Sequence, residues 1–240
     1  MKRFWSTASV GWRDGLGHVI LLDGKPVHIP SGSLLAVPGP ALAAAIAAEW
    51  QAAGGEPGGA WRPTDTPLTQ LAATALDRIA PDPLPTVDAL AAYGETDLLC
   101  YRATAPVALI EREAREWQPW LDWAASALDA PLRVTAGIGF VAQDPDALAA
   151  LRRVVAAADA WTLAGLGVAV PALGSLVLGL ALAAQRLDPA EAHRIATLDA
   201  RFQAEIWGID EEAAAHDRAV AADVELADRF IRLTRADATP

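Results

Sequence analysis

The residues that could carry out catalysis or bind a metal are few and scattered along the chain. His18 and His28 flank a predicted strand pair, and His193 and His216 lie on different predicted helices. Neither His193 nor His216 has a carboxylate or a second histidine three or four positions ahead, the spacing that places two metal ligands on one helix face. We therefore expect no metal site, and structural or surface roles for all four histidines.

The single cysteine, Cys100, lies between Leu99 and Tyr101 in a predicted strand. A catalytic thiolate needs a nearby cation or a helix N-terminus to lower its pKa, whereas burial in a strand raises that pKa. We expect Cys100 to be a core residue. One cysteine also excludes an internal disulfide, which suits a reducing compartment.

One glycine motif, Gly137–Ala142, matches the G-x-G-x-x-A form of the dinucleotide-binding fingerprint. In such sites the glycines open a helix whose N–H groups face the pyrophosphate. Here the helix start is marked later, at Asp144-Pro145, and the acidic Asp159 falls within or at the end of a helix. A nucleotide-binding oxidoreductase using this turn is the alternative function. The context favours no cofactor, no catalytic residue and a protein that is not an enzyme.

The other notable side chains are those that build surfaces and cores. Three glutamates, Glu111, Glu113 and Glu116, alternate with arginines on one predicted helix, which indicates a solvated, salt-bridged face. The chain has 9 tryptophans against 4 phenylalanines. Because tryptophan is enriched both in cores and at interface hot spots, each can serve either purpose.

These residues must be positioned by an α+β fold. The chain begins with a predicted hairpin, because Asp23-Gly24 stands between two apolar runs and both residues tolerate positive φ. The short apolar segment Thr96–Arg102 is predicted to be a strand that joins this sheet. Helix starts such as Asp188-Pro189 follow it. We therefore expect a small mixed N-terminal domain with an antiparallel hairpin sheet (1–104) and an all-helical C-terminal domain (105–240).

A long uncharged segment, Ala160–Gln185, could in principle span a membrane. Pro171 and Gly174 interrupt its middle, and proline ends or kinks a helix because it lacks an N–H and clashes with the preceding turn. The two halves are each too short to cross a bilayer of about 30 Å. The sequence predicts a buried helical hairpin and no stable membrane insertion.

The charge balance excludes several kinds of partner. The 240 residues carry 19 Lys and Arg against 30 Asp and Glu, a formal net charge of -11. Such a surface repels phosphate backbones and anionic lipid heads, so we expect no nucleic-acid partner. The N-terminal Met1–Ser6 has two cations but no apolar stretch behind them. We therefore expect no signal peptide, and either a cytoplasmic bacterial protein or a processed organelle protein.

A series of local motifs, read in order along nearly the whole chain, is shared with one known family. They are Arg3-Phe4-Trp5, Leu22-Asp23-Gly24-Lys25-Pro26-Val27, Ala48-Glu49-Trp50, Pro67-Leu68-Thr69-Gln70-Leu71-Ala72, Thr96-Asp97-Leu98-Leu99-Cys100-Tyr101-Arg102, Trp117-Gln118-Pro119-Trp120-Leu121-Asp122-Trp123, Gly174-Ser175-Leu176-Val177-Leu178 and Phe202-Gln203-Ala204-Glu205-Ile206-Trp207-Gly208. The chain resembles the Atp-twelve (Atp12) family, the α-subunit-binding assembly chaperones of F-type ATP synthase. The ordered series is specific, although no single motif is.

The resemblance implies a chaperone that binds the free α subunit and shields the surface that the β subunit later covers. It implies no cofactor, a monomer when free, and the mitochondrial matrix as the equivalent location in a eukaryotic relative. It also implies partner-binding residues on one late helix and at one earlier position. These are Glu205, Asp199, Trp207, Gly208 and Trp50. Ala200 and Arg201 stand where some family members have acids, so simple charge matching is not implied.

Overall fold

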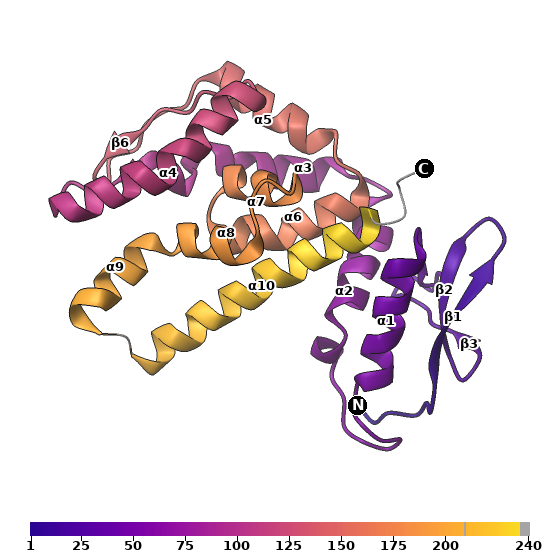
Figure 1. Cartoon of the computed structure of the whole chain (residues 1–240). Helices are drawn as coiled ribbons and strands as arrows, with labels where there is room; N and C mark the ends of the chain where they lie inside the picture. Colours follow the sequence, from indigo (N-terminus) through magenta and orange to yellow (C-terminus); the bar gives the residue numbers. More distant parts are fainter. Residues whose placement is uncertain (209, 236–240) are drawn as a thin grey trace. The chain divides into compact units, whose positions relative to one another are not determined.

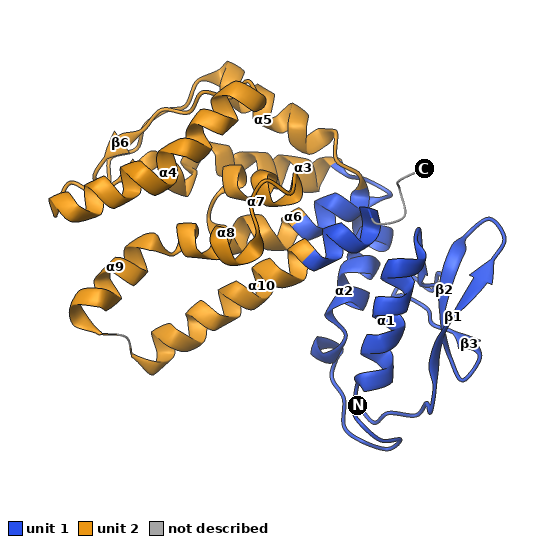
Figure 2. Ribbon diagram, viewed as in Figure 1, with its two compact units in different colours: residues 1–83, 160–165, 229–240 blue, residues 84–159, 166–228 orange. Residues whose placement is uncertain are grey.

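The computed structural model describes residues 1–208 and 210–235 and shows a small antiparallel sheet followed almost entirely by helices (Figure 1). This confirms the α+β prediction. The chain forms two compact units (Figure 2). Unit 1 comprises 1–83, 160–165 and the segment from Arg229, and unit 2 comprises 84–159 and 166–228.

The sheet of unit 1 is centred on β2 (Gly17–Leu22). Strand β1 (Ala8–Arg13) pairs antiparallel with β2, and the two-residue strands β3 (Lys25–Pro26) and β4 (Ala36–Val37) also pair with β2. The predicted Asp-Gly turn joins β2 to β3, with φ of 48° at Asp23 and 78° at Gly24. The hairpin prediction is confirmed.

Helices α1 (Pro40–Ala52) and α2 (Pro67–Thr74), which a π-helical turn (Ala75–Ile79) continues, complete the core of unit 1. Both begin with proline, which suits the first helical turn, where an N–H has no intrahelical acceptor. The apolar stripe along α1, formed by Leu42, Ile46 and Trp50 at helical spacing, is buried.

Unit 2 is built from helices that pack around α7 (Leu176–Ala183), whose eight residues are all buried. The others are α3 (Leu84–Ala91), α4 (Val107–Ala127), α5 (Pro145–Ala156), α6 (Ala160–Leu173, whose first turns belong to unit 1), α8 (Pro189–Ala196), α9 (Leu198–Trp207) and α10 (Glu211–Arg235, whose last turns belong to unit 1). Helices α5 and α8 begin as predicted, because the Asp144 and Asp188 carboxylates accept backbone N–H groups of the first turn.

The uncharged segment is broken at Gly174, as predicted, whereas Pro171 lies inside α6 and does not end it. Helix α6 ends at Leu173, Gly174 adopts a φ of 62°, and the Ser175 hydroxyl accepts the Leu178 N–H at the start of α7. The break leaves two helices of 14 and 8 residues. Within residues 1–208 and 210–235, no helix has both the length and the apolar character needed to cross a membrane.

The strand predicted at Thr96–Arg102 is wrong in its pairing and mostly wrong in its conformation. Residues 92–96 and 98–100 form 3-10 helices, and only Tyr101–Arg102 (β5) is extended, parallel to β6 (Thr135–Ala136) in unit 2. The cause is the buried Asp97 carboxylate, which accepts the Leu99 N–H at 3.1 Å and the Val177 N–H at 3.0 Å. The compact units divide at Pro83, and the predicted domain boundary at residue 104 stays a prediction.

Candidate functional site

Four of the five predicted site residues lie on α9 or directly after it. Asp199 is in its first turn, Glu205 and Trp207 are in its last turns, and Gly208 ends it. The helix stops because Gly208 takes a φ of 81°, a conformation that side chains with a Cβ disfavour. The late helix predicted from the sequence is therefore a single helix, α9, and four of the predicted residues lie on it or directly after it.

Trp50, the fifth residue, belongs to the core of unit 1. It is 7% exposed and packs against the rings of Trp5 and Trp61, with centroids 5.0 and 5.1 Å away. Its indole Nε1 donates to the Thr69 hydroxyl at 3.0 Å, and the neighbouring Glu49 carboxylate accepts the Leu68 N–H at 2.8 Å. The motif around Trp50 therefore holds α1 on α2, and a role for Trp50 in partner binding remains a prediction.

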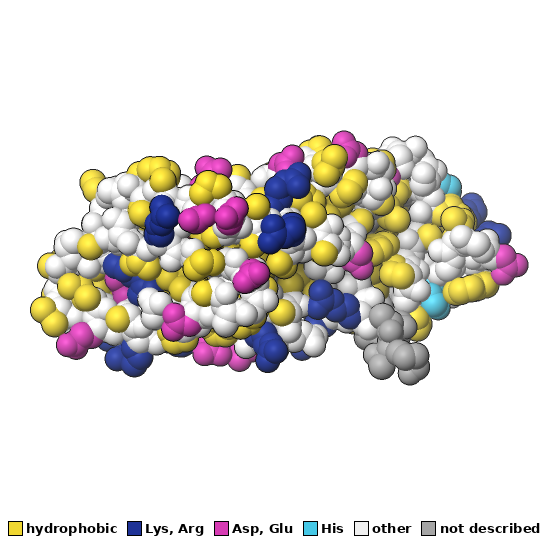
Figure 3. All heavy atoms as spheres, turned by 90° about the horizontal axis from the view of Figure 1, so that it is seen from above, with side chains coloured by type: hydrophobic (Ala, Val, Ile, Leu, Met, Phe, Trp, Pro, Cys, Tyr) yellow, Lys and Arg dark blue, Asp and Glu magenta, His cyan; other side chains and the backbone are white. Residues whose placement is uncertain are grey.

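The outer end of α9 exposes two large apolar side chains. Ile206 is 57% exposed and Trp207 is 75% exposed. Other exposed apolar side chains of unit 2 include Val107, at the start of α4, and Ile138 and Phe140, in the loop after β6. Figure 1 shows β6 and α9 at the same side of unit 2, and Figure 3 shows hydrophobic side chains lying between charged ones on its surface. Exposed apolar groups with a charged rim are typical of protein-binding surfaces.

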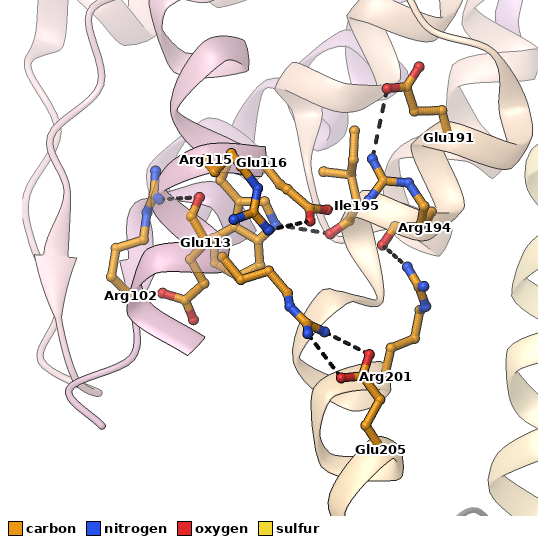
Figure 4. A network of polar contacts seen from close by, with 11 residues as sticks. Arg102, Glu113, Arg115, Glu116, Glu191, Arg194, Ile195, Arg201 and Glu205 are labelled. Carbon is orange, nitrogen blue, oxygen red and sulfur yellow. Dashed lines mark hydrogen bonds and ion pairs between the residues drawn. The ribbon is translucent and has the colours of Figure 1, made fainter. Parts of the chain in front are cut away.

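A bidentate ion pair holds the end of α9 against α4. The Arg112 guanidinium donates to both carboxylate oxygens of Glu205, at 2.7 and 2.9 Å (Figure 4). Its central carbon also lies 5.2 Å from the centroid of the Phe202 ring. The hydrogen bonds from Arg112 lower the pKa of Glu205, so this carboxylate is ionised at neutral pH. Glu205 thus fixes the last turn of α9, which carries Trp207.

Helix α8 is tied to α4 by a second set of contacts. The Arg194 guanidinium pairs with the Glu116 carboxylate, and the Trp117 Nε1 donates to the Ile195 carbonyl at 2.9 Å (Figure 4). His193 Nε2 lies 2.9 Å from an oxygen of Asp217 on α10. These contacts link α4, α8 and α10 into the frame from which α9 projects.

Beneath the Arg112–Glu205 pair, α4 and α9 bring two carboxyl groups together. Glu113 is fully buried, and its Oε2 accepts the Ala103 N–H at 2.8 Å. Burial, together with the neighbouring Asp199 carboxyl, raises the pKa of Glu113 to about 7, and burial raises the pKa of Asp199 as well. The prediction that Glu113 lies on a solvated face is wrong.

The glycine motif lacks the geometry of a dinucleotide site. Strand β6 has two residues, Gly137 follows it with a φ of 82°, and no helix begins until Pro145. The N-terminus of that helix already holds the Asp144 carboxylate, which accepts the Asp146 N–H at 3.0 Å. A pyrophosphate would meet this negative charge instead of free N–H groups.

The remaining candidates for chemistry are structural. Cys100 is buried, as predicted, and burial raises its pKa to about 12, so it is protonated at neutral pH. Among the residues that the structure describes, no three His, Cys, Asp or Glu side chains are grouped so that they could hold a metal ion.

The family of the chain follows from comparison with known proteins. A family model described as ATP12 chaperone protein matches residues 2–125. The chain belongs to the ATP12 chaperone family. The family resemblance seen in the sequence motifs is confirmed, and it extends beyond the matched residues in the structural comparisons.

Three solved structures of similar proteins cover nearly the whole chain. Atp12 from Paracoccus denitrificans is 43% identical, with a TM-score of 0.90 and 98% of each chain covered. A mutant of that protein with lysine in place of an aspartate is 42% identical, with the same TM-score and coverage. A protein from Agrobacterium tumefaciens, proposed to be a chaperone, is 35% identical with a TM-score of 0.87, and the match covers 96% of this chain and 84% of that one. The ATP12 fold therefore includes the α8–α10 region, which the family model does not reach.

Proposed function

We propose that this protein is an assembly chaperone for the catalytic head of F-type ATP synthase. It binds the free α subunit and shields the α-subunit surface that the β subunit later covers. The observation that carries the proposal is the end of α9, where Ile206 and Trp207 are exposed next to the Arg112–Glu205 pair. Membership in the ATP12 chaperone family supports it.

The proposed surface has the features that a holding chaperone requires. An aggregation-prone apolar surface on the client is matched by an aromatic anchor, and Trp207 supplies one with a large contact area. The charged groups around it keep the free chaperone soluble and the exchange fast. Such a chaperone works by mass action: it stabilises the client while bound, and a better partner displaces it, so no nucleotide hydrolysis is needed.

The location and state of the free protein are part of the same proposal. The net charge of -11 disfavours anionic surfaces, and the similar structures come from bacteria. We infer a cytoplasmic protein that is monomeric until it meets the α subunit.

Protection of the isolated α subunit from aggregation tests this function. On warming, an equimolar amount of the chaperone should suppress most of the light scattering from the α subunit, because the bound client exposes less apolar surface. The Trp207→Ser variant should protect poorly. Trp12→Ser is the matched control, because it removes an exposed tryptophan from β1 of unit 1. Equal scattering with and without the wild-type chain would refute the proposed function.

A further inference from the structure

Asp199, one of the predicted partner-binding residues, lies beside Glu113 in a buried carboxyl pair between α4 and α9. Glu113 Oε1 and Asp199 Oδ1 are both buried, and no N–H or O–H group of the described residues donates to either atom. The two carboxyl groups are instead each other's side-chain hydrogen-bond partners. Two carboxyl groups can form such a bond only while one of them holds a proton.

The nearest cation does not neutralise this pair by a direct hydrogen bond. Arg102 on β5 donates to the backbone carbonyls of Leu99 and Glu113, both at 2.9 Å, and its guanidinium lies 5.3 Å from the centroid of the Trp117 ring. Its charge acts on Glu113 only through space. None of these contacts supplies a donor to Glu113 Oε1 or Asp199 Oδ1.

The other charged groups on the surrounding helices are engaged elsewhere. They pair as Arg112 with Glu205, Arg194 with Glu116 and Glu191, and His193 with Asp217, while Arg201 donates to the Arg194 carbonyl. Of these elements, α4 and α9 carry the carboxyl pair itself. The proton on this pair is therefore a variable charge at the α4–α9 contact.

We propose that Glu113 and Asp199 form a proton-operated latch, which holds α9 on α4 while they share a proton and loosens α9 when that proton is lost. Because α9 carries Ile206 and Trp207, loosening it weakens the hold on the client. This consequence rests on the proposed function, whereas the latch itself is a property of the free chain. On loosening, the proton passes to water and the two carboxylates separate.

The direction of the pH effect follows from the raised pKa values. The latched pair keeps a proton up to about pH 7, whereas separated, solvated carboxyl groups lose theirs near pH 4 to 5. Between these limits the latched state binds more protons than the loosened one, so raising the pH favours loosening. The equilibrium constant for loosening should rise by about tenfold for each pH unit from about pH 5 to pH 7, and then level off.

Hydrogen exchange of the α9 amides in the full-length free protein tests the latch. After correction for the intrinsic exchange rate, the protection of α9 should fall by about tenfold per unit between pH 5 and pH 7. In the Glu113→Gln variant the amide oxygen can still accept the Ala103 N–H, and the amide N–H can donate to Asp199 at every pH. We expect its α9 protection to be high and independent of pH.

Two further variants make the result decisive. Asp199→Asn supplies an amide N–H donor from α9 instead of α4, and should also remove the pH dependence. This variant keeps the test possible if Glu113→Gln does not fold. Glu111→Gln is the matched control, at an exposed position of the same helix, and should keep the wild-type profile. Protection of α9 in the wild-type chain that does not change with pH, or a profile that survives both latch variants, would overturn the proposal.

Measuring the affinity for the isolated α subunit at two pH values tests the latch and the proposed function separately. If both hold, binding of the isolated α subunit should weaken from pH 6 to pH 7.5 in the wild-type chain and stay constant in Glu113→Gln. Absence of α-subunit binding at either pH would refute the proposed function and leave the exchange result intact. Binding that weakens equally in both proteins would show that the pH effect comes from another group, and would overturn the link between latch and client.

Discussion

The Arg3→Ala variant is expected to lose about 4 kcal/mol of unfolding free energy, because it removes the donor that satisfies five backbone carbonyls of unit 1. Arg3 is 3% exposed, and its guanidinium donates to the carbonyls of Trp5, Ser6, Gln51, Ala53 and Gly55. The same group lies 5.4 Å from the centroid of the Trp5 ring. Alanine would remove this donor from all five carbonyls, of which the Ser6 carbonyl still accepts from Gln51 Nε2, and would open a space beside the tryptophan cluster.

Urea unfolding followed by tryptophan fluorescence measures this loss, since Trp5, Trp50 and Trp61 report on unit 1. Arg3→Lys should recover only part of the stability, because one ammonium group offers three donors from a single point and cannot reach carbonyls spread around a planar fork. Arg13→Ala, at an exposed arginine of β1, is the control and should change stability by less than about 0.5 kcal/mol. A loss below about 1 kcal/mol in Arg3→Ala would show that water replaces the guanidinium at little cost.

The Glu205→Lys variant is expected to weaken the complex with the free α subunit by at least about tenfold, a free-energy change of about 1.4 kcal/mol. It replaces the bidentate Arg112–Glu205 pair with two like charges, which moves the last turn of α9 and with it Trp207. The free chain should stay folded, because the pair is solvent-accessible and such pairs contribute little to stability. Calorimetric titration of the α subunit with wild-type and variant chains measures the change.

Two controls define what Glu205 does. Glu225→Lys makes the same change of charge at an exposed position of α10 and should bind like the wild type. The charge swap Arg112→Glu with Glu205→Arg rebuilds the ion pair in reverse. Restored affinity would make Glu205 a positioning residue, and a persistent loss would indicate direct contact with the client. Wild-type affinity in a folded Glu205→Lys variant would remove this residue from the site.

Local signals in the sequence predicted much of the fold correctly. The Asp23-Gly24 turn, the Asp144-Pro145 helix start and the break at Gly174 are each decided by the backbone preferences of a few adjacent residues. Such preferences act over one turn, so they can be recognised without knowing what lies across the molecule.

Features that depend on distant partners were missed. Tyr101–Arg102 pairs with Thr135–Ala136 and not with the N-terminal sheet, and Asp97 finds partners on α7 that are about 80 positions away. The composition of Thr96–Arg102 is typical of an apolar strand, and it does not show which N–H groups will donate to the buried Asp97 carboxylate.

The burial of Glu113 could have been predicted from its position in the helical repeat of α4, although its charge indicated an exposed residue. Leu109, Glu113, Trp117 and Leu121 are spaced by four, so Glu113 lies on the buried stripe of α4. The alternating glutamates and arginines indicated a solvated face, although the helical period places Glu113 with the leucines and the tryptophan. Its partner Asp199 lies 86 positions away, and only the packing of α9 on α4 identifies it.

Formation and release of a complex with the α subunit tests the central claim most directly. The purified chain is titrated into isolated α subunit, the mixture is separated by size-exclusion chromatography, and β subunit is then added. We expect a saturable one-to-one complex that releases the chaperone when β covers the same surface. No complex at micromolar concentrations, or a complex in which the chaperone and β bind α together without displacement, would contradict it.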